Sequence, residues 1–246
     1  MSKKLLTLLA LSASLSLSAS ANGATHWSYD DAHSSPAHWG ELDEKFTACS
    51  NGLNQSPINL TAFTQAELPA LTFNYHLKST EILNNGHTVQ VNMEAGSTVK
   101  VDGIAFELKQ FHFHTPSENN INSKSFPLEA HFVHASAKGE LAVLAVMLSE
   151  GEANEALKGL WKNMPMKAGD KHAQVQDNIS TLLPKNKDYY RFNGSLTTPP
   201  CTEGVRWLVM KEAVSMSKAQ IEAFQKVMKH PNNRPIQATN ARAVLQ

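Results

Sequence analysis

The chain has 246 residues, of which 22 are Lys or Arg and 22 are Asp or Glu, so its formal net charge at pH 7 is zero. Such a balance gives no indication of a basic surface for nucleic acid or for an anionic membrane, so neither is an expected partner. The length is enough for one sizeable core, and all-β domains commonly reach it without dividing.

The N-terminus has the pattern of a secretory signal peptide. Lys3 and Lys4 precede an apolar stretch over residues 5–17, and small residues follow through Ala19-Ser20-Ala21. This pattern predicts that residues 1–21 are a signal peptide with an A-x-A cleavage site. A retained membrane anchor is the alternative, but the apolar stretch is diluted with serines and lacks a stop-transfer pattern.

Cleavage would leave a mature domain over residues 22–246 with a net charge near −2, because two lysines are removed (20 basic minus 22 acidic). The residue directly after the cleavage site is Asn22 and not cysteine, which argues against a lipid anchor. We expect the protein to be exported to the periplasm, or otherwise secreted. The only cysteines are Cys49 and Cys201. An oxidising compartment favours pairing of an even number, so we expect one disulfide, with two buried thiols as the alternative.

Alternating apolar and polar residues predict half-buried strands in the first half of the chain. These strands are expected at residues 71–75, 88–93, 98–101 and 104–114. Asn84-Asn85-Gly86 and Asp102-Gly103 lie between them as turn signals, and the second pair strongly indicates a hairpin.

In the second half, the run at residues 141–148 is apolar on both faces, as a central strand would be, and residues 205–211 are similar. Helical periodicity covers residues 152–161 and 217–229, where Ser217 can cap the second helix. Irregular stretches remain at residues 22–60, 164–187 and 230–246. Together these patterns predict a mainly β (α+β) single domain, with a large twisted, mostly antiparallel central sheet, a few peripheral helices and long ordered loops.

Two histidines lie two residues apart in one predicted strand, His112 and His114. Side chains alternate faces along a strand, so both point the same way. Residues 128–135 can return antiparallel beside them and present a third imidazole. His131 and His134 have opposite parity, so only one can join, and alternation alone does not say which. Three histidines on zinc leave one position open for water, which is the catalytic rather than the structural arrangement.

At these residues the chain resembles the α-class carbonic anhydrases, in their bacterial exported branch, over nearly all of the mature sequence. The motifs that carry the resemblance occur in family order: Gln55-Ser-Pro-Ile58, Leu83-Asn-Asn-Gly-His87, Gln110-Phe-His-Phe-His114, Ser117-Glu118, Glu129-Ala-His-Phe-Val-His134, Leu141-Ala-Val-Leu144, Gly194-Ser-Leu-Thr-Thr-Pro-Pro200 and Asn233-Arg-Pro235. The resemblance implies His131 as the third ligand, Zn²⁺ as the cofactor, and carbonate dehydratase (lyase) activity. In that reaction zinc-bound hydroxide attacks carbon dioxide to give bicarbonate and a proton.

Two other functions are alternatives to carbonate dehydratase activity for a chain with these motifs. A metal-free carbonic-anhydrase-like binding module would keep the fold but lose a ligand, whereas all three ligands are present here. A zinc hydrolase with another substrate would not be expected to have the apolar pocket that the resemblance implies. The expected partner is a small-molecule substrate, and the chain would be a monomer or a homodimer.

The resemblance also implies roles for residues around the metal. Gln110 would accept the outer proton of His112, Glu129 that of His131, and a backbone carbonyl near Asn232 that of His114. Thr197 would accept a hydrogen bond from the hydroxide and donate its own proton to the carboxylate of Glu118, because a carboxylate can only accept.

Substrate and proton transfer complete the implied site. Thr198 would hydrogen-bond substrate or solvent, and His87 would carry the proton to bulk solvent, a task that suits an imidazole pKa near 6.5. Carbon dioxide has no net dipole, so its pocket should be apolar. The residues that match the family's apolar wall are Val133, Val143, Leu196, Val205 and Trp207. The disulfide would tie the N-terminal region to the loop that carries Thr197.

Overall fold

The computed structural model describes residues 25–76, 78–173 and 182–246. The predicted signal peptide, residues 1–21, lies outside the described residues. The strands of the described part are β1 (Asn59–Leu60), β2 (Thr72–Asn74), β3 (Ser79–Asn84), β4 (Val89–Met93), β5 (Thr98–Val101), β6 (Ile104–His114), β7 (Asn120–Ile121), β8 (Leu128–Ser136), β9 (Leu141–Glu150), β10 (Lys171–Ala173), β11 (Tyr189–Ser195), β12 (Glu203–Met210) and β13 (Val214–Met216).

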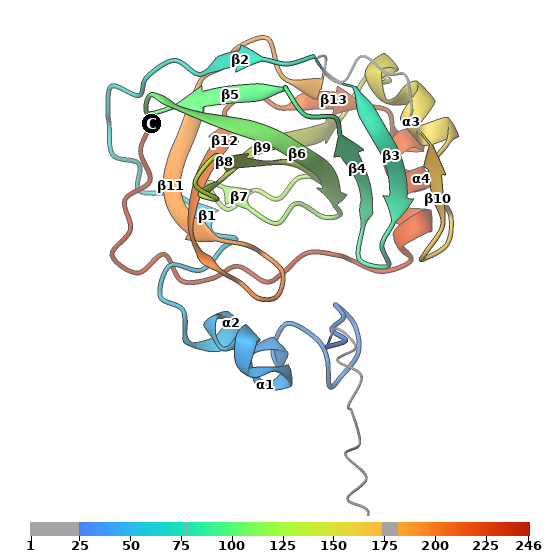
Figure 1. Ribbon diagram of the computed structural model, residues 1–246, viewed down its shortest axis with the longest axis horizontal. Coiled ribbons are helices and arrows are strands. Elements are labelled where there is room, and N and C mark those ends of the chain that lie inside the picture. The colour runs from blue at the N-terminus through green and yellow to red at the C-terminus, as the bar shows by residue number, and fades with distance from the viewer. Residues whose placement is uncertain (1–24, 77, 174–181) are drawn as a thin grey trace, which may run out of the picture.

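Most of these strands form one large sheet with the order β10-β3-β4-β6-β8-β9-β12-β11 (Figure 1). β5 joins the sheet by pairing with β6, β2 pairs with β5, and β13 pairs with β9. Pairing is antiparallel except where β12 and β13 run parallel to β9 and where β1 pairs with β7 in a small second sheet. The predicted mainly β fold is confirmed, and the two parallel neighbours of β9 make the sheet mixed.

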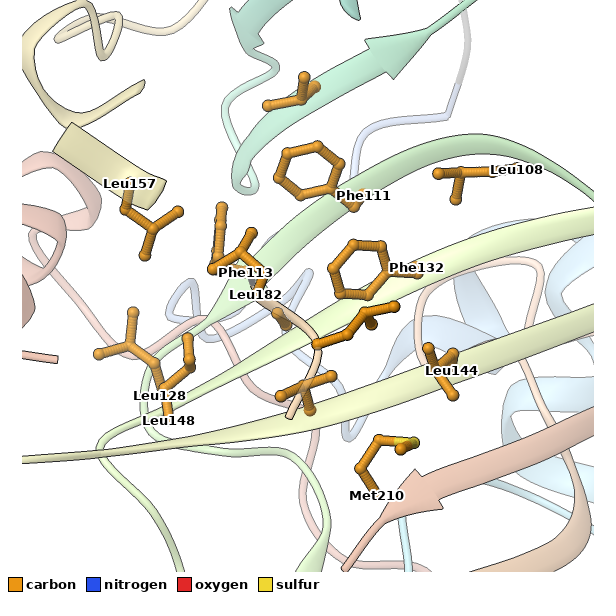
Figure 2. Close-up of a cluster of buried hydrophobic side chains, with 14 of the residues drawn as sticks. Leu108, Phe111, Phe113, Leu128, Phe132, Leu144, Leu148, Leu157, Leu182 and Met210 are labelled. Carbon is orange, nitrogen blue, oxygen red and sulfur yellow. The ribbon is translucent and has the colours of Figure 1, made fainter. Parts of the chain in front are cut away.

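The central strands separate an apolar face from the face that carries the candidate site. Phe111 and Phe113 of β6 lie on the apolar face with Phe132 of β8, and Leu144 of β9 packs beside them (Figure 2). This cluster extends to the C-terminal helix through Phe224. Because successive strand residues alternate, the residues between these phenylalanines point to the opposite face.

A β-bulge in β6 changes the phase of that alternation. Phe106 and Leu108 face the apolar cluster before the bulge, and Phe111 and Phe113 face it afterwards. The pairing with β8 shifts between Leu108 and Gln110, which leaves an extra residue on the bulged strand. The strand at residues 104–114 is therefore confirmed, but a single alternation does not run through it.

The hairpin predicted at Asp102-Gly103 joins β5 and β6, and both residues have positive φ, 52° and 80°. Two positive φ angles are what a two-residue type I′ turn requires, and glycine adopts the second without strain.

The helices are short and lie outside the sheet. They are α1 (Trp39–Leu42), η1 (Glu44–Phe46), α2 (Ala48–Asn51), η2 (Glu155–Leu157), α3 (Lys158–Lys162) and α4 (Lys218–Met228). α3 and α4 lie together beside β10, whereas α1 and α2 lie at the N-terminal end (Figure 1). Ser217 caps α4 in a capping box with Gln220, as the sequence predicts for Ser217. Among the described residues, no helix is long and apolar enough to cross a bilayer.

Two of the stretches predicted to be irregular contain regular structure. Residues 22–60 include α1, η1, α2 and β1, and residues 164–187 include β10. These elements have two to four residues each, which is too short for periodicity to reveal them.

Candidate metal centre

Three histidines meet on the face of the central strands that lies opposite the phenylalanine cluster. His112 is directly opposite His131 across the β6–β8 pair, and His114 follows two residues later on the same face. One ring nitrogen from each lies within 4.8 Å of the others. His134 points to the other face, where its Nε2 lies 2.5 Å from Tyr75 Oη. The strand register therefore brings His131, and not His134, to the other two histidines.

The outer nitrogens of the two β6 histidines each face an oxygen acceptor. His112 Nδ1 lies 2.7 Å from Gln110 Oε1, and His114 Nδ1 lies 2.7 Å from the backbone carbonyl of Asn232. A carbonyl oxygen can only accept, so each Nδ1 carries the proton and each Nε2 is left with a free lone pair. Both free nitrogens then face the centre of the cluster.

For His131 the roles of the two ring nitrogens are exchanged. Its Nε2 lies 2.9 Å from Glu129 Oε1, although the approach is not aligned as a full hydrogen bond. The nearby carboxylate favours a proton on Nε2, which leaves Nδ1 as the free nitrogen. Glu129 is itself fixed by Asn119, whose backbone N–H donates to Oε2 (2.8 Å) and whose Nδ2 donates to Oε1 (2.7 Å). Burial raises the pKa of Glu129 to about 6, and the two Asn119 hydrogen bonds oppose that rise.

The three imidazoles are suited to bind a cation. Burial lowers the pKa of each, and for His112 and His131 neighbouring imidazoles lower it further. The rings are therefore neutral at pH 7, as metal ligands must be. His114 Nε2 is also a buried atom without a hydrogen-bond partner. Three histidine nitrogens are a common ligand set for zinc in catalytic sites. The donor set thus fits zinc.

Glu118 and Thr197 lie beside this cluster. Glu118 is buried, and its Oε2 is 3.4 Å from His114 Nε2. Its Oε1 accepts the backbone N–H of Arg234 at 2.8 Å. Burial raises the pKa of Glu118 well above its usual range, whereas the Arg234 N–H and the nearby Thr197 side chain lower it.

The predicted apolar residues form one wall. Val133, Val143 and Trp207 are cross-strand neighbours on β8, β9 and β12. Val205 and the half-buried Leu196 belong to the same cluster. The Trp207 ring meets His131 edge-on, with 5.0 Å between ring centroids, so the wall borders the histidines. The remaining predicted residue, Thr198, is half-buried directly after Thr197, and its carbonyl accepts the Cys201 N–H.

His87 lies on the turn between β3 and β4. Its carbonyl accepts a hydrogen bond from Asn232 Nδ2 at 3.0 Å, so the residue that faces His114 also holds this turn. The His87 ring stacks on Trp27, with 3.6 Å between centroids and 8° between planes. Burial lowers the pKa of His87, and the nearby His26 and His230 lower it further. His87 is therefore held by Trp27, from near the N-terminus, and by Asn232, from near the C-terminus.

The disulfide predicted between Cys49 and Cys201 is present, with the two Cα atoms 5.0 Å apart. It joins α2 to the segment between Thr197 and β12.

Several residues at the site are not among those that the sequence predicts. They are Gln55, Asn119, Trp27 and Arg234. Asn119 follows the quoted Ser117-Glu118 motif, and Gln55 and Arg234 lie inside quoted motifs, so their positions were marked but their contacts were not. Trp27 has no sequence signal of a role at the site.

The sheet and the buried histidine cluster match one class of protein. Residues 34–246 match the family described as eukaryotic-type carbonic anhydrase. The chain therefore belongs to the eukaryotic-type (α) carbonic anhydrase family and is an enzyme of that family.

Individual relatives agree over nearly the full length. The carbonic anhydrase of Neisseria gonorrhoeae is 49% identical over 98% of this chain and 96% of its own. Among solved structures, the α-carbonic anhydrase of Thermovibrio ammonificans, in complex with the inhibitor sulfanilamide, has a TM-score of 0.89 at 46% identity, over 91% of this chain and 100% of its own. That of Photobacterium profundum has a TM-score of 0.84 at 51% identity, over 90% of this chain and 100% of its own.

Proposed function

We propose that the protein catalyses the reversible hydration of carbon dioxide to bicarbonate and a proton, with a zinc ion held by His112, His114 and His131. The observation that carries the proposal is the arrangement of these rings: each has one nitrogen facing an oxygen acceptor and the other facing the common centre. Zinc bound by three neutral imidazoles keeps its full double charge and lowers the pKa of a coordinated water to about 7, which supplies a nucleophile near neutral pH.

Gln110, Asn232 and Glu129 act in this proposal by orienting the ligands. An acceptor on the outer nitrogen fixes the tautomer and the rotation of the imidazole, so the inner lone pair is aimed before a metal arrives. Two buried carboxylates, Glu118 and Glu129, would also offset the double charge of the ion.

Thr197 and Glu118 orient the nucleophile. The Arg234 N–H and a cation at the triad both favour the charged form of Glu118, which can then only accept. The Thr197 hydroxyl hydrogen therefore points to Glu118, and its oxygen is left to accept the hydrogen of the attacking oxygen. A lone pair is thereby directed toward carbon dioxide, which rests against the apolar wall beside Thr198.

His87 removes the proton. Its lowered pKa leaves the imidazole neutral at pH 7, so it can accept a proton from the site and release it to solvent. The proposed direction of transfer is from the buried site to the rim, where the Trp27–His87 stack lies.

The test is stopped-flow carbon dioxide hydration on the purified protein, before and after removal of metal by a chelator and again after zinc is restored. We expect activity to be lost and regained with zinc content measured by elemental analysis. Activity that persisted without metal would exclude the proposal, and so would a zinc-loaded protein without hydration activity.

β8 offers a matched pair of variants for this test. His131→Gln should lower zinc content and activity together, whereas His134→Gln, three residues away on the opposite face, should retain both. Equal zinc loading of the two variants would contradict the assigned ligand set.

We also propose that the protein is exported as a mature domain of residues 22–246. The disulfide supports an oxidising compartment. N-terminal sequencing of the protein recovered from a periplasmic fraction should begin at Asn22. A start at Met1 or Ser2 would count against cleavage.

A further inference from the structure

Arg234 is a buried cation whose side chain, among the described residues, donates to three neutral acceptors. It is 1% exposed. Nη1 donates to Gln55 Oε1 and to the carbonyl of Ser56, and Nη2 donates to the carbonyl of Cys49, each at 2.8 Å. Burying a charge is costly unless its donors are satisfied, so this guanidinium is fixed tightly in the segment that contains Cys49, Gln55 and Ser56.

The backbone of the same residue holds Glu118. The Arg234 N–H donates to Glu118 Oε1 at 2.8 Å. Glu118 lies in the irregular connection between β6 and β7, so no strand ladder fixes it. Its carboxylate is therefore held by a residue that is anchored through its own side chain.

Gln55 connects this anchor to the Thr197 loop. Gln55 Nε2 donates to the carbonyl of Cys201 at 3.0 Å, and the Cys201 N–H donates to the carbonyl of Thr198 at 2.8 Å. Ser56 clamps the start of the same loop, because its N–H donates to Ser195 Oγ at 2.9 Å and its Oγ accepts the Ser195 N–H at 3.1 Å.

These contacts close a ring around the Thr197–Glu118 pair. From Glu118 it passes through Arg234, Gln55 and Cys201 to the backbone beside Thr197, whose side chain lies close enough to Glu118 to lower the pKa of its carboxyl. Glu118 and Thr197 come from different irregular segments, so the sheet alone cannot set the distance between their side chains.

We propose that Arg234 and Gln55 are positioning residues that fix the Thr197 hydroxyl relative to the Glu118 carboxylate. The inference rests on the proposed function, since it concerns how that pair orients the nucleophile. A displacement of about 1 Å can cost on the order of 100-fold in rate, so loss of either link should be visible in the chemical step.

The experiment compares Arg234→Met and Gln55→Leu with wild type, with Thr197→Val as the reference for complete loss of the hydroxyl. Arg191→Met is the matched control, because Arg191 pairs with Asp102 at the surface and away from the site. Zinc content, melting temperature, kcat and kcat/KM for carbon dioxide hydration are measured for each zinc-loaded protein in a buffer without imidazole, so that proton transfer passes through His87.

We expect kcat/KM to fall by roughly tenfold or more in both variants. The fall in kcat should be smaller, because kcat also contains the later proton transfer through His87, which the ring does not touch. A merely structural defect would instead remove active protein and lower kcat and kcat/KM by the same factor. Arg191→Met should leave both constants unchanged.

Arg234→Lys separates geometry from charge. Lysine keeps the positive charge but cannot reach three acceptors with a planar fork, so it should not restore kcat/KM. Full restoration by lysine would overturn the proposal, and so would wild-type kcat/KM in folded, zinc-loaded Gln55→Leu. If Arg234→Met does not fold, Gln55→Leu decides the result. Failure of the proposed function is distinct from this, because it would appear as inactive zinc-loaded wild type.

Discussion

At the scale of single residues, His87 shows how its surroundings change the pKa of the proposed proton carrier. The imidazole is half-buried against Trp27, and burial is the largest cause of its lowered pKa. A ring that is neutral at pH 7 and partly open to solvent can accept a proton and pass it on. The proposed proton transfer needs the imidazole of His87, whereas the backbone of the turn takes no part in it.

We therefore predict that His87→Ala slows turnover in weak buffer by 10-fold or more, on the order expected for loss of a positioned proton carrier. Added imidazole should restore most of the rate, because a free base can replace the missing one. Stopped-flow rates across a series of imidazole concentrations measure this. His76→Ala, at an exposed histidine, is the control. Equal wild-type and His87→Ala rates in weak buffer would refute the role.

A second prediction at this scale concerns Trp27. Burial disfavours the imidazolium form, so removing the ring that covers His87 should raise its pKa toward 6.5. Proton NMR titration of the His87 ring in Trp27→Ala measures the change. The apparent pKa in the pH dependence of turnover in weak buffer should then be higher than in wild type. A pKa that stays fixed or falls would show that stacking on Trp27 does not determine it.

At the scale of elements, the sequence predicted the strands more readily than their pairing. Alternation placed His112 and His114 on one face, and that was sufficient for two of the three proposed ligands. It could not choose between His131 and His134, because that choice depends on the register of β8 against β6, with His131 opposite His112. Register is set by contacts between strands, and a single strand's pattern does not contain it.

The bulge in β6 illustrates the same limit. Apolar residues at 104, 106 and 108 give way to 111 and 113, so the change of phase is visible in the sequence. The bulge itself, with its shift of register between Leu108 and Gln110, forms only when β8 pairs with both halves of the strand. Short elements such as β1, β7 and β10 were not predicted, since two or three residues carry no period.

The opposite face of β8 gives a prediction on acid stability. His134 is fully buried, and burial lowers its pKa to about 4. The unfolded chain would bind a proton near pH 6.5 while the folded protein would not, so this residue reduces stability as pH falls from about 6.5 to 4. The loss approaches roughly 1.4 kcal/mol per pH unit, or about 3 kcal/mol in total.

His134→Gln removes this titration. Urea unfolding of wild type and variant at several pH values, with equal metal loading, gives the difference in their free energies of unfolding. We expect the wild-type advantage to shrink by about 3 kcal/mol between pH 7 and pH 4. Contributions from the other histidines are common to both proteins and cancel. A difference that does not change with pH would mean that His134 is not held neutral by burial.

At the scale of the whole molecule, the site depends on contacts between distant parts of the chain. Arg234 reaches Cys49 across 185 residues, and Gln55 reaches Cys201 across 146. No local pattern encodes such contacts. The resemblance to a family marked the segments that contain Gln55 and Arg234 without giving the bonds between them. The geometry of the assembled fold supplies the physical reason that these motifs occur together.

The disulfide belongs to this scale as well, because it closes a covalent loop over more than half of the chain. Its two cysteines are 152 residues apart. In the chain-entropy model such a loop destabilises the unfolded state by about 5 kcal/mol, and measured bridges often give less. For a protein of this size each kcal/mol corresponds to roughly 2–4 °C of melting temperature, so the double variant Cys49→Ala/Cys201→Ala should melt ~10–20 °C lower at most.

Calorimetry on the zinc-loaded proteins, with and without a reductant, measures this loss of melting temperature, and thiol titration verifies reduction. Because the variant has no bridge to break, a reductant should lower the wild-type melting temperature and leave that of the variant unchanged. A wild-type melt that stayed constant after complete reduction would mean that the non-covalent contacts of Arg234 and Gln55 suffice to hold residues 49 and 201 together.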